Sequence, residues 1–400
     1  MKVGLYGIQG VYNFGCEAII RGAYNFIKSI YPNCEVYYYS YDSQNDKKVL
    51  EDLQIEIISV EMNKTIQKRL FNKIAKTIGY NKRILLFNAN KIIDSVDVIV
   101  SVGGDIYTIP QILRERKRYP YYNPLVDFCD KAIKKGKEVI VYGASVGPWG
   151  EYQKAVDYNI NALSKYKLIL CREEETIEYL KSKGLINVMF FPDPAFQIRV
   201  QETNKKNYIG INFSPLSLKE LYGSYDDAYV KKISTLMDRL YETTSINLMF
   251  IPHVLSKSES DNDLLFMKKI VEYMKHYDKV IFADTSEGFI GVKKYISQCY
   301  VVIAARMHCA INAIDENIPA IFLSYSQKSI GMCKYIYGND EYLIPLKDIE
   351  KELINKVVKV IQESEMVSNR LKSRNEEIRE YYESNLNAIK IFLDKELGGE

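Results

Sequence analysis

The stretch VVIAARMHCAINAIDENIPAIFLSYSQK, residues 301–328, alternates between patterns typical of a strand and of a helix. Its first four residues form an apolar run typical of a buried strand, and residues 310–314 supply the apolar face of a short helix. That helix ends before Pro319, and residues 320–323 form a second apolar strand. A strand, a helix and a strand in close succession predict a unit of a parallel α/β sheet.

Polar side chains stand just after each of these two strands. Arg306 and His308 follow the first strand, and Tyr325 and Lys328 follow the second. Ligands of open α/β sheets bind outside the carboxyl ends of the strands, where a helix start adds free N–H groups and a positive dipole end. The stretch therefore predicts an anion-binding site. The alternative interpretation is that His308 only caps its helix and Arg306 pairs with a surface acid.

Strands and helices alternate in the same way along most of the chain. Apolar strand patterns occur at residues 2–7, 35–41, 55–60, 96–102, 138–143, 167–171, 188–191, 208–213, 246–252 and 279–283. The polar stretch QETNKKN, residues 201–207, divides them and is typical of a linker. We therefore predict an α/β fold with two doubly wound Rossmann-like domains, residues 1–200 and 207–365. A charged helix is expected over residues 366–400.

Composition narrows the class of protein. The chain has 400 residues, of which 47% are hydrophobic and 26% charged, as is ordinary for a soluble globular enzyme. A net charge of only +3 carries no signature of nucleic-acid binding. The seven cysteines form no CxxC pair and share no metal-ligand spacing with the three histidines. We expect a cytoplasmic protein, because the amino terminus lacks a signal-peptide core and no run of 18 apolar residues occurs.

One segment departs from this balance of charges. Residues 62–93 contain eight Lys or Arg and no Asp or Glu. Within residues 64–78 the apolar and basic side chains fall on opposite halves of a helix, a pattern typical of helices that lie on an anionic membrane surface. Peripheral contact with the inner face of the cell membrane is one interpretation of this segment. An ordinary surface helix with a solvated basic face is the other.

Several motifs together resemble one family of enzymes. An Arg-x-His after a buried strand, followed by x-Pro-x-Ile-x-x-x-Tyr-x-x-Lys up to residue 328, is similar to the polysaccharide pyruvyl transferases. Near the amino terminus the family motif is matched by Asn13, Gly15, Glu17, Ala18 and Ile19. Three further matches are Gly103-Gly104, Gly147-Pro148 and Pro192-Asp193-Pro194-Ala195. The last is Pro252-His253, which is followed by the acids Asp261 and Asp263. The resemblance therefore covers most of the chain.

The resemblance implies a GT-B-like fold, in which the two domains face each other across a cleft. It also implies a reaction that uses phosphoenolpyruvate. The donor's carboxyvinyl unit is joined to two hydroxyls of one sugar, which yields a cyclic pyruvate ketal and releases phosphate. The donor carries a carboxylate and a phosphate, so Arg172 and Arg306 are expected to bind these groups in bidentate fashion and to take part in catalysis. His308 is the expected general acid, because an imidazole can exchange protons near neutral pH.

The other expected site residues are assigned either to the donor site or to the acceptor site. The donor site also includes Tyr325, Lys328, His253 and Ser145, and the acceptor site includes Gln9, Asn13, Gly15, Glu17 and Asp105. The acceptor is expected to be a glycan or a lipid-linked saccharide. No metal ion and no cofactor besides the phosphoenolpyruvate substrate are expected, because arginine and lysine can balance the donor's charge. Asp193 is interpreted as structural, since the two prolines around it make a stiff, extended crossing.

Two other functions stay open on the sequence alone. A GT-B glycosyltransferase or epimerase would use a nucleotide sugar, which needs a diphosphate site and an acid that binds the ribose. No convincing acid of that kind follows the strand at 319–323. A non-catalytic carbohydrate-binding or scaffold protein is the other alternative, and the cluster of Arg, His, Tyr and Lys at strand ends argues against it. No nucleic-acid partner is expected.

Overall fold

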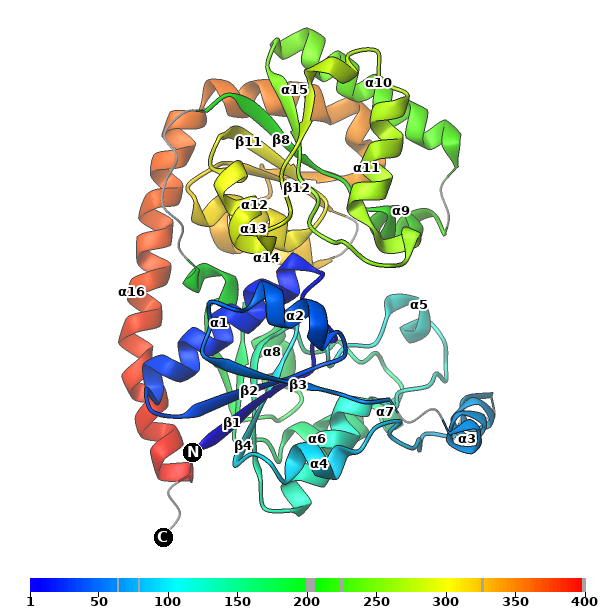
Figure 1. Cartoon of the computed structure of the whole chain (residues 1–400), viewed down its shortest axis with the longest axis vertical. Helices are drawn as coiled ribbons and strands as arrows, with labels where there is room; N and C mark the ends of the chain where they lie inside the picture. The colour runs from blue at the N-terminus through cyan, green and yellow to red at the C-terminus, as the bar shows by residue number, and fades with distance from the viewer. Residues whose placement is uncertain (63–64, 78–79, 199–205, 224–225, 325–326, 398–400) are drawn as a thin grey trace. The chain divides into compact units, whose positions relative to one another are not determined.

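The chain folds into two compact units, each with a parallel sheet. The computed structural model describes residues 1–62, 65–77, 80–198, 206–223, 226–324 and 327–397 (Figure 1). Unit 1 consists of Met1–Val11, Ile19–Pro194 and Tyr382–Glu400, and unit 2 consists of Tyr12–Ala18 and Ala195–Tyr381. Each unit has its own hydrophobic core, so the predicted α/β class with two doubly wound sheets is confirmed.

The sheet of unit 1 is entirely parallel. Its strands are β1 (Lys2–Tyr6), β2 (Glu35–Ser40), β3 (Ile55–Ser59), β4 (Val98–Val102), β5 (Glu138–Ala144), β6 (Leu168–Cys171) and β7 (Val188–Phe190). In the described part of the unit their order is β3-β2-β1-β4-β5-β6-β7. The central strands β1 and β4 are almost wholly buried, as expected of a sheet that is covered on both faces. The winding reverses between β1 and β4.

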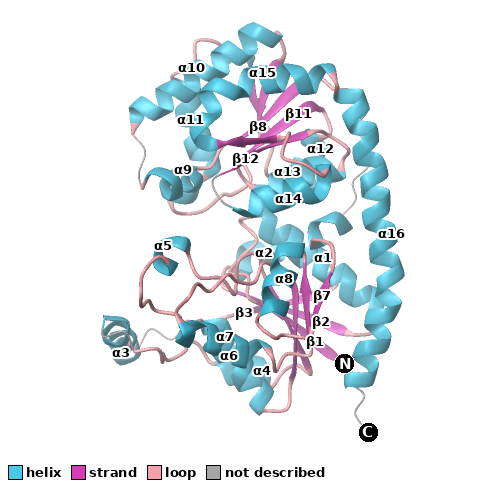
Figure 2. Ribbon diagram, turned by 180° about the vertical axis from the view of Figure 1, so that it is seen from behind, coloured by secondary structure: helices cyan, strands magenta, loops and turns pink. Residues whose placement is uncertain are grey.

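The helices of unit 1 are α1 (Phe14–Ile30), α2 (Ser43–Val49), α3 (Ile66–Thr77), α4 (Ala89–Ile93), α5 (Gln111–Arg114), α6 (Pro124–Lys134), α7 (Gln153–Leu163) and α8 (Glu174–Ser182). Most of them lie beside the sheet, whereas α3 and α5 stand away from its strands (Figure 2). Local sequence sets where they begin. At α6, for example, Pro124 is the first helical residue, and the Asn123 side chain accepts a hydrogen bond of 2.9 Å from Leu125 N.

The sheet of unit 2 is also parallel. Its strands are β8 (Tyr208–Asn212), β9 (Asn247–Phe250), β10 (Val280–Phe282), β11 (Cys299–Ala304), β12 (Ala320–Ser324) and β13 (Leu343–Pro345). Their order among the described residues is β10-β9-β8-β11-β12-β13, so the winding reverses between β8 and β11. The carboxyl ends of β8 and β11 therefore mark the position where such a sheet binds its ligand. The strand, helix and strand predicted between residues 301 and 323 are β11, α13 and β12.

The helices of unit 2 lie between its strands and after the last of them, with two helices between β8 and β9. They are α9 (Pro215–Tyr222), α10 (Asp227–Thr244), α11 (Asp263–Glu272), α12 (Gly288–Ile296), α13 (Met307–Asp315), α14 (Gln327–Tyr337) and α15 (Ile349–Gln362), and α16 (Ser364–Leu397) comes last. Short 3-10 turns lie at Pro194–Gln197, Glu259–Asp261, Tyr277–Lys279 and Leu346–Asp348. None of the described helices combines the length and the hydrophobicity that crossing a bilayer requires.

Most of the expected linker at 201–207 lies outside the described residues. Two other segments are grouped differently from the expected domains. The expected final helix at 366–400 is part of α16, which is counted with unit 2 up to Tyr381 and with unit 1 beyond it. The segment Tyr12–Ala18 was expected with the first domain, but it belongs to unit 2 because its backbone bonds to residues there.

Candidate functional site

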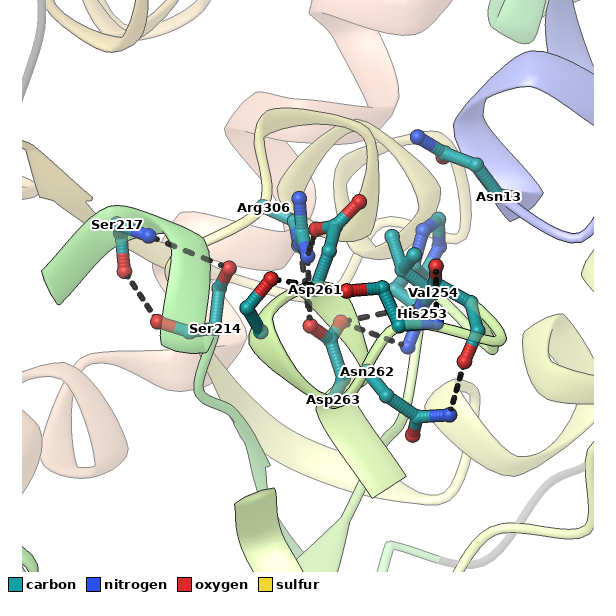
Figure 3. Close-up of polar contacts among 12 residues, drawn as sticks. Asn13, Ser214, Ser217, His253, Val254, Asp261, Asn262, Asp263 and Arg306 are labelled. Atoms are coloured by element: carbon teal, nitrogen blue, oxygen red, sulfur yellow. Dashed lines mark hydrogen bonds and ion pairs between the residues drawn. The ribbon is translucent and has the colours of Figure 1, made fainter. Parts of the chain in front are cut away.

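Arg306 lies between β11 and α13, where the strand ends and the helix begins. Its backbone N–H donates to Asn212 Oδ1 at 2.9 Å, which ties it to the carboxyl end of the neighbouring strand β8. Its guanidinium donates to Asp263 Oδ1 from Nε at 3.2 Å and from Nη2 at 2.9 Å. Nη2 also donates to Asp261 Oδ1 at 2.6 Å (Figure 3). The two strands at the reversal of winding thus hold this arginine together with two carboxylates.

Asp263 is the fixed partner in this cluster. It is the first residue of α11, and its side chain is fully buried. Its second oxygen, Oδ2, accepts hydrogen bonds from Asn212 Nδ2 at 3.2 Å, from His253 N at 3.2 Å and from Val254 N at 3.1 Å (Figure 3). Burial raises the pKa of Asp263, while Arg306 and these N–H donors act against that rise. A carboxylate with so many donors positions both Arg306 and the turn after β9.

The cluster of Arg306, Asp261 and Asp263 has no net positive charge. One guanidinium and two carboxylates sum to a formal charge of −1. Burial lowers the pKa of Arg306, but Asp263 and Asp261 offset this effect and the net shift is upward, so the guanidinium stays charged. The Asp261 side chain is 33% exposed, whereas that of Asp263 is 0% exposed, so Asp261 is the partner that a ligand can displace. Nη1 of Arg306 makes no hydrogen bond with any described residue and remains available to an anion.

His253 is a buried imidazole beside this cluster. It follows β9 and is 1% exposed, and within the described part of the chain neither of its ring nitrogens has a hydrogen-bond partner. Burial foremost, and then the nearby His308 and Arg306, lower the pKa of His253 well below its usual range. Its ring meets those of Phe14 and Phe289 edge to face, with centroids 5.7 and 6.1 Å away. The ring is therefore neutral and can offer a donor and an acceptor to a bound molecule.

The segment Tyr12–Ala18 is bonded to the turn that holds His253. Phe14 N donates to His253 O at 3.0 Å, and Tyr12 O accepts a hydrogen bond of 2.9 Å from Leu255 N. Between these two bonds Asn13 forms an isolated antiparallel bridge with Val254. The Asn13 side chain accepts a hydrogen bond of 2.9 Å from the N–H of residue 15, so it caps the start of α1. The expected acceptor residue Asn13 thus has a structural role in unit 2.

Gly15 and Glu17 also gain specific partners from this packing. A Cβ placed on Gly15 would lie only 2.6 Å from Nδ1 of His308, so the absence of a side chain lets the imidazole approach. His308 itself is half-buried in the first turn of α13. Glu17 is fully buried, and its Oε2 accepts a hydrogen bond of 2.7 Å from Phe289 N at the start of α12. Glu17 was expected to bind acceptor, whereas here its carboxylate binds the amino end of a helix, where a negative charge is favourable.

A second charged cluster surrounds Arg172 in unit 1. Arg172 is 1% exposed, and its Nη1 donates to Asp193 Oδ2 at 2.7 Å. Its Nε and Nη2 donate to Ser145 Oγ at 3.3 and 3.1 Å, and Glu173 Oε1 accepts from Ser145 Oγ at 2.7 Å. Asp105, half-exposed, has an oxygen 3.9 Å from Nη2. Burial lowers the pKa of Arg172, but Asp193, Glu173 and Asp105 produce a net rise. Arg172, which was expected to bind the donor, is thus buried among acidic side chains. Its hydrogen bond to Asp193 agrees with the structural role expected for that aspartate.

The expected residues thus divide between the two units. Unit 2 holds Arg306, His308, His253, Asn13, Gly15 and Glu17, and unit 1 holds Arg172, Ser145, Asp105 and the exposed Gln9. Tyr325 and the side chain of Lys328 lie outside the described residues. Sequence reasoning did not single out Asn212, although a polar residue that ends an apolar strand was a usable signal. Among the described residues, no group of His, Cys, Asp and Glu could hold a metal ion.

Solved structures with the same fold bind nucleotides. HepE from Anabaena, in complex with UDP and glucose, matches with a TM-score of 0.58 at 10% identity, over 100% of this chain and 99% of that one. The UDP-GlcNAc 2-epimerase from Neisseria meningitidis, bound to UDP-GlcNAc, matches with a TM-score of 0.56 at 11% identity, over 96% of this chain and 100% of that one. At such identities the likeness shows the fold alone, which is that of the GT-B glycosyltransferases and epimerases.

Sequence similarity gives a more specific result. The amylovoran biosynthesis protein AmsJ of Erwinia amylovora is 20% identical over 377 residues, which cover 84% of this chain and 86% of that protein. Residues 13–327 match the sequence profile of the family described as polysaccharide pyruvyl transferase. This range includes Arg306, His308, His253 and both aspartates of their cluster. Because the match extends over far more than half of its length, the chain belongs to the polysaccharide pyruvyl transferase family.

Proposed function

We propose that this transferase moves a pyruvate group from phosphoenolpyruvate to two hydroxyls of one sugar and releases phosphate. The family match over residues 13–327 carries the proposal, because it makes the protein a transferase of polysaccharide synthesis. The position of Arg306 and His308 supports it. Both stand at the amino end of α13, beside the reversal of winding in unit 2, where an anionic donor is expected.

Donor binding draws on four sources of positive charge or hydrogen-bond donors. Nη1 of Arg306 and the first N–H groups of α13 can bind a carboxylate or phosphate oxygen. The donor's own negative charge is unfavourable beside a cluster that already sums to −1, so displacement of Asp261 from Nη2 is part of the proposal. Protonated His308 would add a further positive charge. The neutral ring of His253 supplies a hydrogen bond to the bound donor without adding charge.

His308 acts as the general acid in the proposed reaction. It delivers a proton to the methylene carbon of the donor, which turns that carbon into a methyl group and leaves an oxocarbenium-like centre next to it. One sugar hydroxyl adds to this centre and loses its proton. The C–O bond to phosphate then breaks, and a second hydroxyl of the same sugar closes the ketal as phosphate takes up its proton. Two hydroxyl protons thus balance the new methyl group and the released hydrogen phosphate.

The acceptor in this proposal is a glycan or a lipid-linked saccharide. The similarity to an amylovoran biosynthesis protein supports a polysaccharide precursor as its source. Gln9 and Asp105 are exposed or half-exposed in unit 1 and remain the proposed acceptor contacts there. A lipid-linked acceptor would place the enzyme at the inner face of the cell membrane, with residues 64–78 as the proposed contact.

Calorimetry separates this function from its main alternative, a glycosyltransferase or epimerase that uses a nucleotide sugar. We expect heat of binding when the full chain is titrated with phosphoenolpyruvate, and none with UDP-glucose or UDP-GlcNAc. A coupled phosphate assay should then show phosphate release that requires both donor and a glycan acceptor. Tight binding of a UDP-sugar together with no binding of phosphoenolpyruvate would overturn the proposal.

A further inference from the structure

Helix α3 exposes the face that a surface helix normally buries. It rests on unit 1 through Ala75, which is 2% exposed, and through Asn72, whose amide exchanges two hydrogen bonds of 2.8 Å with the backbone of Ile84. Surface helices of globular proteins turn their apolar stripe toward the core. Here Ala75 is the only fully buried residue among the twelve described positions Ile66–Thr77. The apolar stripe of α3 must therefore point elsewhere.

That stripe faces solvent. Ile66, Leu70 and Ile74 follow one another at spacings of four residues, so they form one row along the helix. They are 80%, 54% and 51% exposed, and Phe71 beside them is 41% exposed. At 3.6 residues per turn, Ala75 lies on the side of the helix opposite Ile66. The helix is thus attached by its narrow small-residue side and presents a row of large aliphatic side chains outward.

Positive charge flanks this row. Arg69, Lys73 and Lys76 are exposed along one edge of it, and Lys68 is half-buried on the other side. The twelve residues of α3 include no Asp or Glu. An uncompensated row of cations next to exposed aliphatic side chains is complementary to a surface that is anionic at its headgroups and apolar beneath them. Nucleic acid offers the charge but no apolar layer for the aliphatic row.

A second basic segment lies, like α3, on the side of unit 1 where the carboxyl ends of its strands are. Residues 111–118, QILRERKR, follow β4 as α3 follows β3, and the carboxyl ends of parallel strands share one edge of a sheet. Ile112 is 68% exposed, and Arg116, Lys117 and Arg118 are all exposed. Figures 1 and 2 show α3 and α5 on the same side of the unit. The chains that follow α3 and α5 meet, because Tyr121 N donates to Asn81 Oδ1 at 3.3 Å.

We propose that α3 and residues 111–118 together form a docking surface for a bilayer that contains anionic phospholipid. The aliphatic row of α3 and Ile112 enter the headgroup region, and the flanking lysines and arginines bind lipid phosphates. The same edge of unit 1 carries the loops after β4 and β5, with Asp105 and Ser145. If the proposed function holds, docking presents these loops to a saccharide that a membrane lipid carries. The docking itself does not depend on that function.

Vesicle co-sedimentation tests the docking surface. We expect the wild type to bind vesicles of phosphatidylcholine mixed with phosphatidylglycerol far better than vesicles of phosphatidylcholine alone. Changing Arg69, Lys73 and Lys76 together to Gln should lower the partition coefficient about 100-fold, because each cation near such a surface contributes roughly a fivefold factor. The triple change of Arg116, Lys117 and Arg118 to Gln should cause a comparable loss. Leu70→Ser with Ile74→Ser should weaken binding while the charge is unchanged.

The matched control removes three other exposed lysines. Lys134, Lys181 and Lys268 changed to Gln produce the same net charge but lie outside the docking surface, so this variant should bind like the wild type. All substituted positions are exposed, and unchanged melting curves would show that the variants fold. Equal vesicle binding by the α3 variant and the control would overturn the proposal, and so would binding of RNA or an acidic protein with no vesicle binding. Phosphate release with a soluble acceptor fragment should stay unchanged in these variants, which separates failure of docking from failure of the proposed reaction.

Discussion

Arg306 shows how neighbouring charges change what a binding residue can do. Its position at a strand end predicts an open cation, yet Asp261 and Asp263 hold two of its three nitrogens. An arginine fixed on one edge keeps its remaining nitrogen in a defined direction, which favours specificity over raw attraction. The affinity for an anion then depends on Nη1, on the start of α13 and on the charge of His308.

Arg306 and His308 should respond differently to substitution. Arg306→Lys keeps the charge but loses the planar fork, so we expect donor binding to weaken by about 1–3 kcal/mol. His308→Gln removes proton transfer, which matters in the transition state, so turnover should fall by about 10²- to 10⁴-fold while donor affinity changes only a few fold. Calorimetry and phosphate release measure the two effects, with melting temperature as the control. Full turnover of His308→Gln would leave His308 as a helix-start residue only.

The two aspartates on Arg306 should have opposite effects. Asp261→Asn removes a half-exposed carboxylate that competes with the donor, so we expect affinity for phosphoenolpyruvate to rise about fivefold, in line with a contact of roughly 1 kcal/mol. Asp263→Asn breaks a fully buried pair and should lower the free energy of unfolding by about 3–5 kcal/mol. Calorimetry and urea unfolding of both variants give the comparison. A loss of affinity in Asp261→Asn would make Asp261 part of the binding site and refute its role as a competitor.

At the scale of elements, the start of α1 positions His308. Asn13 caps the helix, Phe14 N bonds to the turn after β9, and Glu17 bonds to the start of α12. These three contacts fix residue 15 against the first turn of α13. Gly15 has no positive φ, so its backbone does not require glycine, and the contact with His308 is the remaining reason for its small size.

Gly15→Ala should therefore act through His308. The new Cβ would stand 2.6 Å from Nδ1, so the imidazole must move. A displacement of about 1 Å can cost on the order of 10²-fold in rate, so we expect a loss of that size in turnover. The backbone conformation should tolerate alanine, but the new Cβ would also stand 2.8 Å from Cγ and 3.0 Å from Cβ of His308, so the melting temperature should fall slightly. In a double-mutant cycle the change should cost nothing further in a His308→Gln background, and a full additional loss there would contradict the positioning role.

At the scale of the whole molecule, fold and ligand are separate properties. Proteins with this fold bind UDP and UDP-sugars at identities near 10%, whereas the sequence profile assigns this chain to a pyruvyl transferase family. Two parallel sheets supply the carboxyl edges at which ligands bind, and any of several chemistries can be built there. In the proposed function, the side chains that follow β8, β9 and β11 in unit 2 select the donor.

Local sequence patterns are enough to predict most of the helices and strands and the positions of several site residues. Apolar runs, and the Gly and Pro residues that end helices and strands, are signals within short segments of the chain. The strands and the helices between them could therefore be predicted from neighbouring residues. The same holds for the placement of Arg306 and His308 after β11. The apolar face of α3 and its flanking cations were equally visible in the sequence. The family motifs lie in the same local segments.

Contacts between groups that are far apart in the chain depend on the tertiary fold. Asp263 lies 43 residues from Arg306, Asn212 lies 94 residues from it, and Glu17 lies 272 residues from Phe289. Periodicity within a segment carries no information about such pairs, because they form when strands far apart in the chain become neighbours in a sheet. The same limit explains Arg172, whose burial against Asp193 could not be foreseen, and α3, whose exposed apolar face depends on what the rest of unit 1 leaves uncovered.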